Sequence, residues 1–280
     1  MAPYPAQPIR GRERYRIMMD IRRLDAHNWL TLDKNYMDEH RVRDLLLREK
    51  RDKVLRCLPE SLASCQETLE VVSEFLTERF PTMFKKTIYE NDTWIENMAT
   101  KERFNIGGQG PTVNGTDALE AAVRLTMEDL SVLMMNEDGE YYLFLARLSP
   151  TSPMERSNYF VEVKRPDEDL HDILYRPGSL CEKELSDPSP DEIIIRRERQ
   201  TFRRLPRTGA IVFGVKTYLT PLRQLPMQQL ENLAKEMKTW PDYVSQYKGK
   251  DLWGKKVLEY YNRRLTEAQG EPTEKVSTEV

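Results

Sequence analysis

The sequence contains few of the residues that form metal centres and disulfide frameworks. Its 280 residues include three cysteines, at positions 57, 65 and 181, and three histidines. The cysteines form no C-x-x-C pair and leave one thiol unpaired in any disulfide scheme, which is typical of a reducing compartment. We therefore expect the cysteines to be small buried residues or unreactive thiols. No histidine pair has i, i+4 spacing, no Cys/His cluster has zinc spacing and no G-x-S-x-G elbow occurs, so a zinc or hydrolytic mechanism has no support in the sequence. His40 lies in a charged helical stretch and is expected to face solvent.

Long apolar runs and a strong net charge are also absent. No run of eighteen apolar residues occurs, so we expect no membrane span and no membrane partner. The first 16 residues contain no apolar stretch of the secretory type, and a cytoplasmic location is expected. The formal net charge of −3 argues against a nucleic-acid coat, and Phe202 is the one aromatic residue within the arginine-rich stretch 192–207. We therefore expect no nucleic-acid partner.

A glycine-rich segment lies in the middle of the chain. Residues 105–115 hold four glycines and a proline, but they lack the G-K-[ST] ending of a phosphate loop and the spacing of G-x-G-x-x-G. We therefore interpret this segment as a connecting loop.

The remaining pattern predicts one domain, residues 15–265, between a disordered leader, residues 1–14, and a disordered tail, residues 266–280. Apolar residues recur at helical spacing over residues 42–58 and 61–80, with Pro59 and Pro81 as stops. Further helices are expected at 116–126, 225–240 and 255–265.

Alternating apolar residues predict the strands. Short strands are expected around the turn Glu90-Asn91-Asp92, a hairpin over residues 131–146, and a strand over 158–163. A longer hairpin is predicted from residues 191–202 and 210–219, with its turn at 205–209 and a mobile loop, 177–190, before it. The fold class is therefore α+β, with an antiparallel sheet, an N-terminal helical pair and C-terminal helices.

The long hairpin carries an unusual concentration of positive charge. Between residues 192 and 207 there are six arginines and two glutamates. Alternation along a strand places these arginines on both faces, so some must point inward or form pairs. A guanidinium is a bidentate partner for carboxylates, including haem propionates, and for phosphates. A charged, solvated strand edge that discourages aggregation is the alternative interpretation.

One stretch is long enough to be specific: Glu198-Arg199-Gln200-Thr201-Phe202-Arg203-Arg204-Leu205-Pro206-Arg207-Thr208-Gly209-Ala210-Ile211-Val212-Phe213, continuing to Lys216-Thr217-Tyr218. It resembles the signature of the haem-dependent oxidative N-demethylase alpha-subunit family. The resemblance extends to other short segments, namely Arg22-Arg23-Leu24-Asp25, Asn28-Trp29-Leu30 with Asp33 and Tyr36, Thr126-Met127-Glu128-Asp129-Leu130, Asn158-Tyr159 and Tyr247-Lys248-Gly249.

The resemblance implies a PAS-like haem-binding core and an oxidoreductase of the monooxygenase type. In such proteins haem activates dioxygen to oxidise an N-methyl group of a small amine, and a separate flavin or iron–sulfur reductase supplies electrons. It also implies that Arg199, Arg203 and Arg204 contact haem propionates or a substrate carboxylate. His171, after a predicted strand, is the candidate iron ligand, unless it is a surface histidine beside acids; Tyr218, Cys181 or a methionine are the other candidates.

The chain departs from the family pattern in its middle. After Leu145-Ala146-Arg147-Leu148 it continues almost directly to Ser157-Asn158-Tyr159, where family members have a longer segment. We therefore predict an internal deletion near residues 146–157. Two functions follow as alternatives: a haem-dependent N-demethylase, or a non-catalytic member that acts as a binding or regulatory module.

Overall fold

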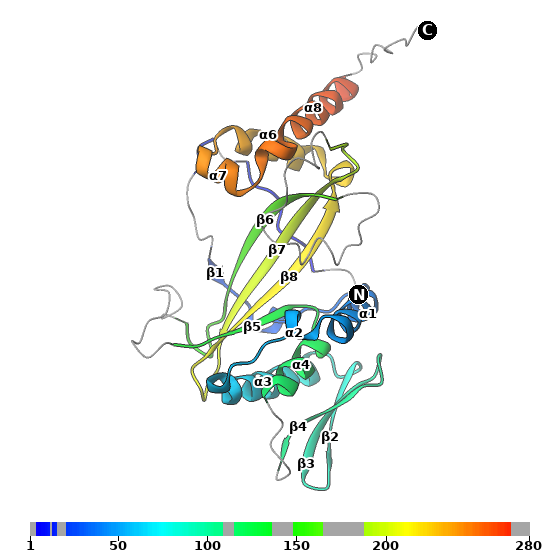
Figure 1. Cartoon of the computed structure of the whole chain (residues 1–280), viewed down its shortest axis with the longest axis vertical. Coiled ribbons are helices and arrows are strands. Elements are labelled where there is room, and N and C mark those ends of the chain that lie inside the picture. Colours follow the sequence, from blue (N-terminus) through cyan, green and yellow to red (C-terminus); the bar gives the residue numbers. More distant parts are fainter. Residues whose placement is uncertain are drawn as a thin grey trace. The chain divides into compact units, whose positions relative to one another are not determined.

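A computed structural model describes residues 4–11, 13–15, 21–108, 115–135, 148–164 and 188–269. Within these residues it confirms the α+β class and the antiparallel sheets: one sheet has five strands and the other has three. The chain groups into two compact units, and Figure 1 labels its helices and strands. Unit 1 comprises Met1–Pro5, Asp20–Ser157 and Arg199–Lys216, and unit 2 comprises Ala6–Met19, Asn158–Glu198 and Thr217–Val280.

The helices of unit 1 are α1 (Tyr36–Glu49), α2 (Arg51–Val54), α3 (Leu62–Arg79) and α4 (Gly115–Leu125), with 3-10 turns at Ala26–Asn28 and Pro59–Ser61. Helix α3 confirms the helix predicted over 61–80, and its predicted apolar face is buried. The prediction for 42–58 was wrong in its continuity, because α1 ends at Glu49 and α2 ends at Val54. Pro59 disfavours helical backbone in the residue before it, and Leu58 is accordingly extended, with ψ 149°.

The three-stranded sheet contains β2 (Phe84–Tyr89), β3 (Asp92–Asn97) and β4 (Arg103–Gly108). The predicted turn between β2 and β3 is confirmed: Glu90 and Asn91 have φ values of 50° and 70°, as a two-residue hairpin turn requires. Strand β4 corrects the prediction that residues 105–108 belong to a loop. These residues pair with β3, and the Asn105 side chain donates to Asp92 Oδ2 at 3.0 Å.

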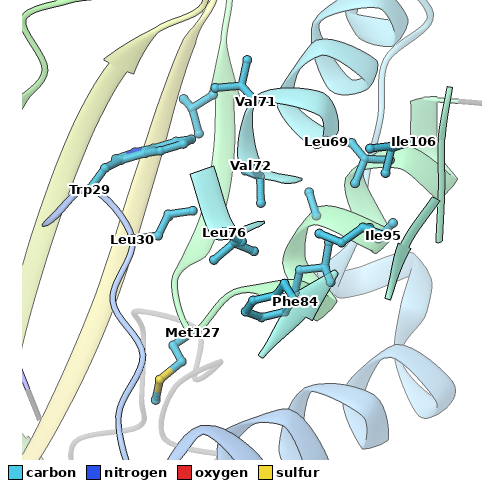
Figure 2. Close-up of a cluster of buried hydrophobic side chains, with 14 of the residues drawn as sticks. Trp29, Leu30, Leu69, Val71, Val72, Leu76, Phe84, Ile95, Ile106 and Met127 are labelled. Carbon is cyan, nitrogen blue, oxygen red and sulfur yellow. The ribbon is translucent and has the colours of Figure 1, made fainter. Parts of the chain in front are cut away.

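A hydrophobic core connects the helices of unit 1 with this small sheet. Figure 2 shows side chains of α3 packing towards the small sheet, with Trp29, Leu30 and Met127 in the same cluster. Leu69, Leu76 and Ile95 are each fully buried. A fully buried aliphatic side chain contributes about 1.5–3 kcal/mol relative to an exposed one. This core fixes the segment that carries Trp29.

The five-stranded sheet has the order β1-β6-β7-β8-β5. Its strands are β1 (Arg22–Arg23), β5 (Asp129–Leu133), β6 (Met154–Val163), β7 (Ile193–Arg204) and β8 (Ile211–Pro221). Strands β7 and β8 confirm the predicted long hairpin, and β6 contains the predicted strand 158–163. The first strand of the predicted hairpin over 131–146 corresponds to β5, which pairs with β8, with Leu133 opposite Ile211; residues 141–146 lie outside the described part.

A buried carboxylate holds the turn of the long hairpin. Glu67 of α3 is 1% exposed and accepts hydrogen bonds from the backbone N–H groups of Arg207, at 2.6 Å, and Thr208, at 2.8 Å. Burial by itself raises the pKa of Glu67, but the hydrogen bonds from Thr208 and Arg207 outweigh it, so the pKa lies below its usual value. The turn is therefore anchored on α3 by an ionised side chain.

We expect the substitution Glu67→Gln to lower the free energy of unfolding by about 1–3 kcal/mol, because an amide has one acceptor atom for two buried donors. Urea unfolding at pH 7 measures this. The depressed pKa means that the contribution is present above the unfolded pKa and is lost as pH falls through the folded one. Glu70→Gln is the matched control, since Glu70 pairs with the 62%-exposed Arg207 side chain. Equal losses in the two variants would contradict the anchoring role.

Unit 2 contains α6 (Met227–Lys238), α7 (Asp242–Tyr247) and α8 (Lys250–Gln269), and a short 3-10 turn, Leu222–Gln224. Helices α6 and α8 confirm the predictions over 225–240 and 255–265, although α8 extends to Gln269. Helix α7 was missed because its six residues are too few to show a periodic pattern. Their apolar faces meet in one core around Leu230, Leu233, Trp253 and Val257. Within the described residues, no helix combines the length and apolarity needed to cross a membrane.

Candidate functional site

The structure places the predicted site residues unevenly. Arg199, Arg203 and Arg204 all lie on β7, within unit 1. Side chains alternate along a strand, so Arg199 and Arg203 share one face and Arg204 lies on the other. His171 and Cys181 lie outside the described residues. Tyr218 lies on β8 and is half-buried.

The Arg199 side chain is buried and bonded to other residues of the protein. Its side chain is 4% exposed, and Nε donates to Glu155 Oε2 at 2.8 Å. The two terminal nitrogens donate to the backbone carbonyls of Asn28 and Trp29. Glu155 also accepts from Arg22 Nε at 2.8 Å, so two guanidinium groups hold one buried carboxylate. Arg199 therefore fastens the Asn28-Trp29 segment to β7.

Arg203 differs from Arg199 in what surrounds its guanidinium. The group lies over the Trp29 ring, 4.4 Å from the centroid, and Trp29 itself is fully buried. Burial lowers the pKa of Arg203, while the charges of Glu74 and Glu78 oppose that effect. No described residue accepts a hydrogen bond from it. A half-buried cation with available donors is suited to a carboxylate or phosphate ligand.

Unit 1 also contains a buried ion pair for which no role was predicted from the sequence. Lys216 Nζ of β8 and Asp33 Oδ2 are 2.9 Å apart, and both side chains are 2% exposed. The thioether of Met127 lies 3.4 Å from Lys216 Nζ and accepts from the Asp33 backbone N–H at 3.3 Å. The alternation of β8 contained the signal, because it places Lys216 on the same face as the buried Val212.

Glu128 adds a second carboxyl group to this polar layer. Its side chain is fully buried, and Oε1 accepts hydrogen bonds from the backbone N–H and the hydroxyl of Thr31, both at 3.0 Å. Burial raises the pKa of Glu128, and the charges of Lys216 and Arg199 offset this only in part. Within the described part of the chain, Oε2 has no hydrogen-bond partner. We call Asp33, Glu128, Lys216 and Arg199 the buried charge cluster.

The charges of this cluster act on the carboxyl group of Glu39 in α1. Burial raises the pKa of Glu39 to about 7, against the favourable charges of Lys216 and Arg43 and with the unfavourable charges of Asp33 and Glu128. A carboxyl group with this pKa changes its charge close to neutral pH.

We expect the stability of the protein to fall as pH rises from 4.5 to about 7, because in this window Glu39 holds its proton in the folded state and loses it in the unfolded state. Because the pKa is raised, the contribution of Glu39 to the free energy of unfolding is fully present below the unfolded pKa. It is lost as pH rises through the folded pKa. It amounts to at most about 3 kcal/mol. Urea unfolding between pH 5 and pH 8 measures it.

Glu39→Gln is expected to remove this part of the pH dependence. Glu49→Gln, at an exposed position of the same helix, is the matched control and is expected to leave it unchanged. If the two variants follow the wild-type curve equally, Glu39 is not the titrating group.

One further expectation about the histidines was wrong. His40 of α1, expected to face solvent, has a side chain that is 12% exposed and lies 2.7 Å from Glu102 Oε2. The charged surroundings that predicted exposure instead form an ion-pair network, in which Arg124 contacts Asp44, Glu102 and Glu120.

Unit 2 holds a half-buried cation of its own. Lys248 Nζ donates to the Tyr159 carbonyl at 2.7 Å and lies 4.6–5.4 Å from the ring centroids of Tyr159, Phe160 and Trp240. Burial lowers the pKa of Lys248 to about 8, with the charges of Glu236 and Glu198 opposing. Two segments of the resemblance, 158–159 and 247–249, therefore meet at this lysine.

Within the described residues, no group of three or more histidine, cysteine, aspartate or glutamate side chains is arranged to hold a metal ion. A comparison with known families finds one that spans both units. The family model described as haem-dependent oxidative N-demethylase, alpha subunit-like, matches residues 20–143 and 143–258. These two segments cover well over half of the 280 residues and include every part of the resemblance noted in the sequence. The chain therefore belongs to the haem-dependent oxidative N-demethylase alpha subunit-like family.

Proposed function

We propose that this protein is a haem-dependent oxidative N-demethylase-like enzyme that acts on a small amine. The observation that carries the proposal is the family match over residues 20–258. It is supported by the convergence of the signature segments in unit 1: Arg199 bonds to the carbonyls of Asn28 and Trp29, Glu128 to Thr31, and Lys216 to Asp33. Segments far apart in the sequence thus meet at one place.

One of the described residues is suited to contact haem. Arg203 would hold a propionate, because no described residue accepts a hydrogen bond from it and it lies partly buried over the Trp29 ring. Arg199 has its donors on protein acceptors, so we propose that it positions the Asn28-Trp29 segment beside Arg203. His171 remains the proposed iron ligand, with Tyr218, Cys181 or a methionine as alternatives. When bound, haem supplies the activation of dioxygen, with electrons from a separate flavin or iron–sulfur reductase.

We also propose that the five-stranded sheet is PAS-like. Strands β6, β7 and β8 are consecutive neighbours, and the earlier strand β5 lies beside the last of them. The pairing of the early strand β5 with the last strand, β8, supports the PAS-like assignment.

Haem titration of the purified apo-protein tests the function. We expect a Soret band that saturates at one haem per chain, and we expect Arg203→Met to weaken haem binding by about tenfold through loss of a charge-assisted contact. Arg223→Met, at a position with a 57%-exposed side chain in unit 2, is the matched control. The absence of a Soret band at stoichiometric haem would reject haem binding by this chain.

A second candidate function is a non-catalytic binding or regulatory module. The observation in its favour is that the family match divides at residue 143, between β5 and β6 and close to the deletion predicted near residues 146–157. This candidate predicts a cooperative thermal unfolding transition without affinity for haem. A Soret band with amine-dependent formaldehyde release, after addition of a reductase, would reject it.

A further inference from the structure

Two cysteine thiols lie in contact within unit 1. Cys57 Sγ and Cys65 Sγ are 3.4 Å apart, and neither is in a disulfide. Cys57 lies in the extended segment between α2 and the turn Pro59–Ser61, and Cys65 lies in the first turn of α3. The eight-residue separation in sequence is bridged by the turn, which brings the two side chains together.

The two thiols differ in their surroundings. Cys65 is 1% exposed, and burial raises the pKa of its thiol to about 11, with the hydrogen bond to Cys57 acting in the same direction. Cys57 is partly exposed. The Ser61 hydroxyl lies 3.3 Å from Cys57 Sγ and 3.8 Å from Cys65 Sγ, so one hydroxyl contacts both sulfur atoms. An accessible thiol beside a buried one is the arrangement of an attacking and a resolving cysteine.

We propose that Cys57 and Cys65 form a reversible disulfide when the protein meets hydrogen peroxide. The Cys57 thiolate attacks one peroxide oxygen, the O–O bond breaks, and a sulfenic acid and hydroxide form. Cys65 sulfur then attacks the Cys57 sulfur and the S–O bond breaks. The Cys65 proton leaves with that oxygen as water, through the adjacent Ser61 hydroxyl. The two thiols lose two electrons in total, and one peroxide molecule is reduced to two water molecules.

The required movement is small and falls on an irregular segment. A disulfide has an S–S length of about 2.05 Å, so the sulfurs must approach by about 1.4 Å. Cys57 lies outside any helix or strand, whereas α3 is held by the core of unit 1. The Cys57 sulfur packs against the start of α4, where a Cβ on Gly115 would lie 3.0 Å from it. Oxidation therefore acts on the contact between segment 55–58 and α4.

Peptide mapping of the full native chain tests the proposal without any substitution. Trypsin cleaves after Arg56 and Arg79, and no lysine or arginine lies between, so both cysteines fall in one peptide, residues 57–79. After peroxide and alkylation under denaturing conditions, we expect this peptide to be unalkylated and about 2 Da lighter, since two hydrogens are lost. Cleavage after Glu60 should leave its two parts joined until dithiothreitol is added.

Three results would overturn the proposal: full alkylation of both cysteines, gain of oxygen atoms on the peptide, or a link from either cysteine to Cys181. The variant Cys181→Ser is the control and should form the bond as the wild type does. In Cys65→Ser the sulfenic acid has no resolving partner, so we expect at least about fivefold more dimedone adduct on Cys57 than in the wild type. Equal labelling would show that Cys65 does not resolve it.

Discussion

Replacing Lys216 with methionine is expected to lower the free energy of unfolding by about 3–5 kcal/mol, because it leaves the Asp33 carboxylate buried without its cation. The pair is 2.9 Å apart, with both side chains 2% exposed, so water cannot take the place of the ammonium group. Methionine matches the length of the lysine stem, which keeps the packing loss small. Urea unfolding followed by tryptophan fluorescence measures the change.

Two comparisons separate charge from packing. The double variant Asp33→Leu with Lys216→Met is expected to recover most of the lost stability, since an apolar pair removes both desolvation penalties. Lys235→Met removes an exposed i, i+4 pair with Glu231 in unit 2 and is expected to leave the unfolding midpoint unchanged. If the double variant is less stable than Lys216→Met alone, the pair is not the source of the effect.

Replacing Arg199 with lysine is expected to cost about 2–4 kcal/mol, although the charge is kept. A lysine is a single point donor, while Arg199 serves Glu155 and the carbonyls of Asn28 and Trp29 together. At least one buried acceptor then loses its partner. Thermal and urea unfolding of the apo-protein measure the loss.

Arg22→Lys is the matched control, because Arg22 binds the other oxygen of Glu155 from a side chain that is 40% exposed. We expect it to cost less than about 1 kcal/mol. Haem titration of the same variants distinguishes a structural arginine from a ligand. An Arg199→Lys protein with wild-type stability and weakened haem binding would make Arg199 a propionate contact instead of a positioning residue.

The sequence predicted the local structure of this fold better than its long-range contacts. The hairpin of β7 and β8, helix α3 and the turn at Glu90 and Asn91 follow from alternation, helical periodicity and turn chemistry over short stretches. Lys216 and Asp33, by contrast, are 183 positions apart, and no periodic pattern connects such residues. Arg199 was predicted as a contact of a haem propionate or a substrate carboxylate, whereas its bonds to Glu155 and to the carbonyls of residues 28 and 29 could not be predicted.

The errors have local physical causes. Residues 105–108 have the glycines of a loop, yet they pair with β3 because Asn105 and Asp92 support the register. The exposure expected of His40 assumed that a charged helix faces water, whereas the His40 side chain contacts Glu102, which is itself paired with Arg124. The family resemblance identified the signature residues of the candidate site, such as Arg199 and Lys216. Only the structure showed that they are buried.

The division of the chain between its two units has a consequence for any attempt to dissect this protein. The chain passes from one unit to the other after residues 5, 19, 157, 198 and 216. Each unit consists of three separate stretches of the chain, so no single cut yields either unit as one continuous polypeptide. A deletion between β5 and β6 lies within the continuous stretch 20–157 and leaves every passage intact. The predicted deletion would therefore leave both units with all their connections, whereas a loss inside β7 would remove residues of both units.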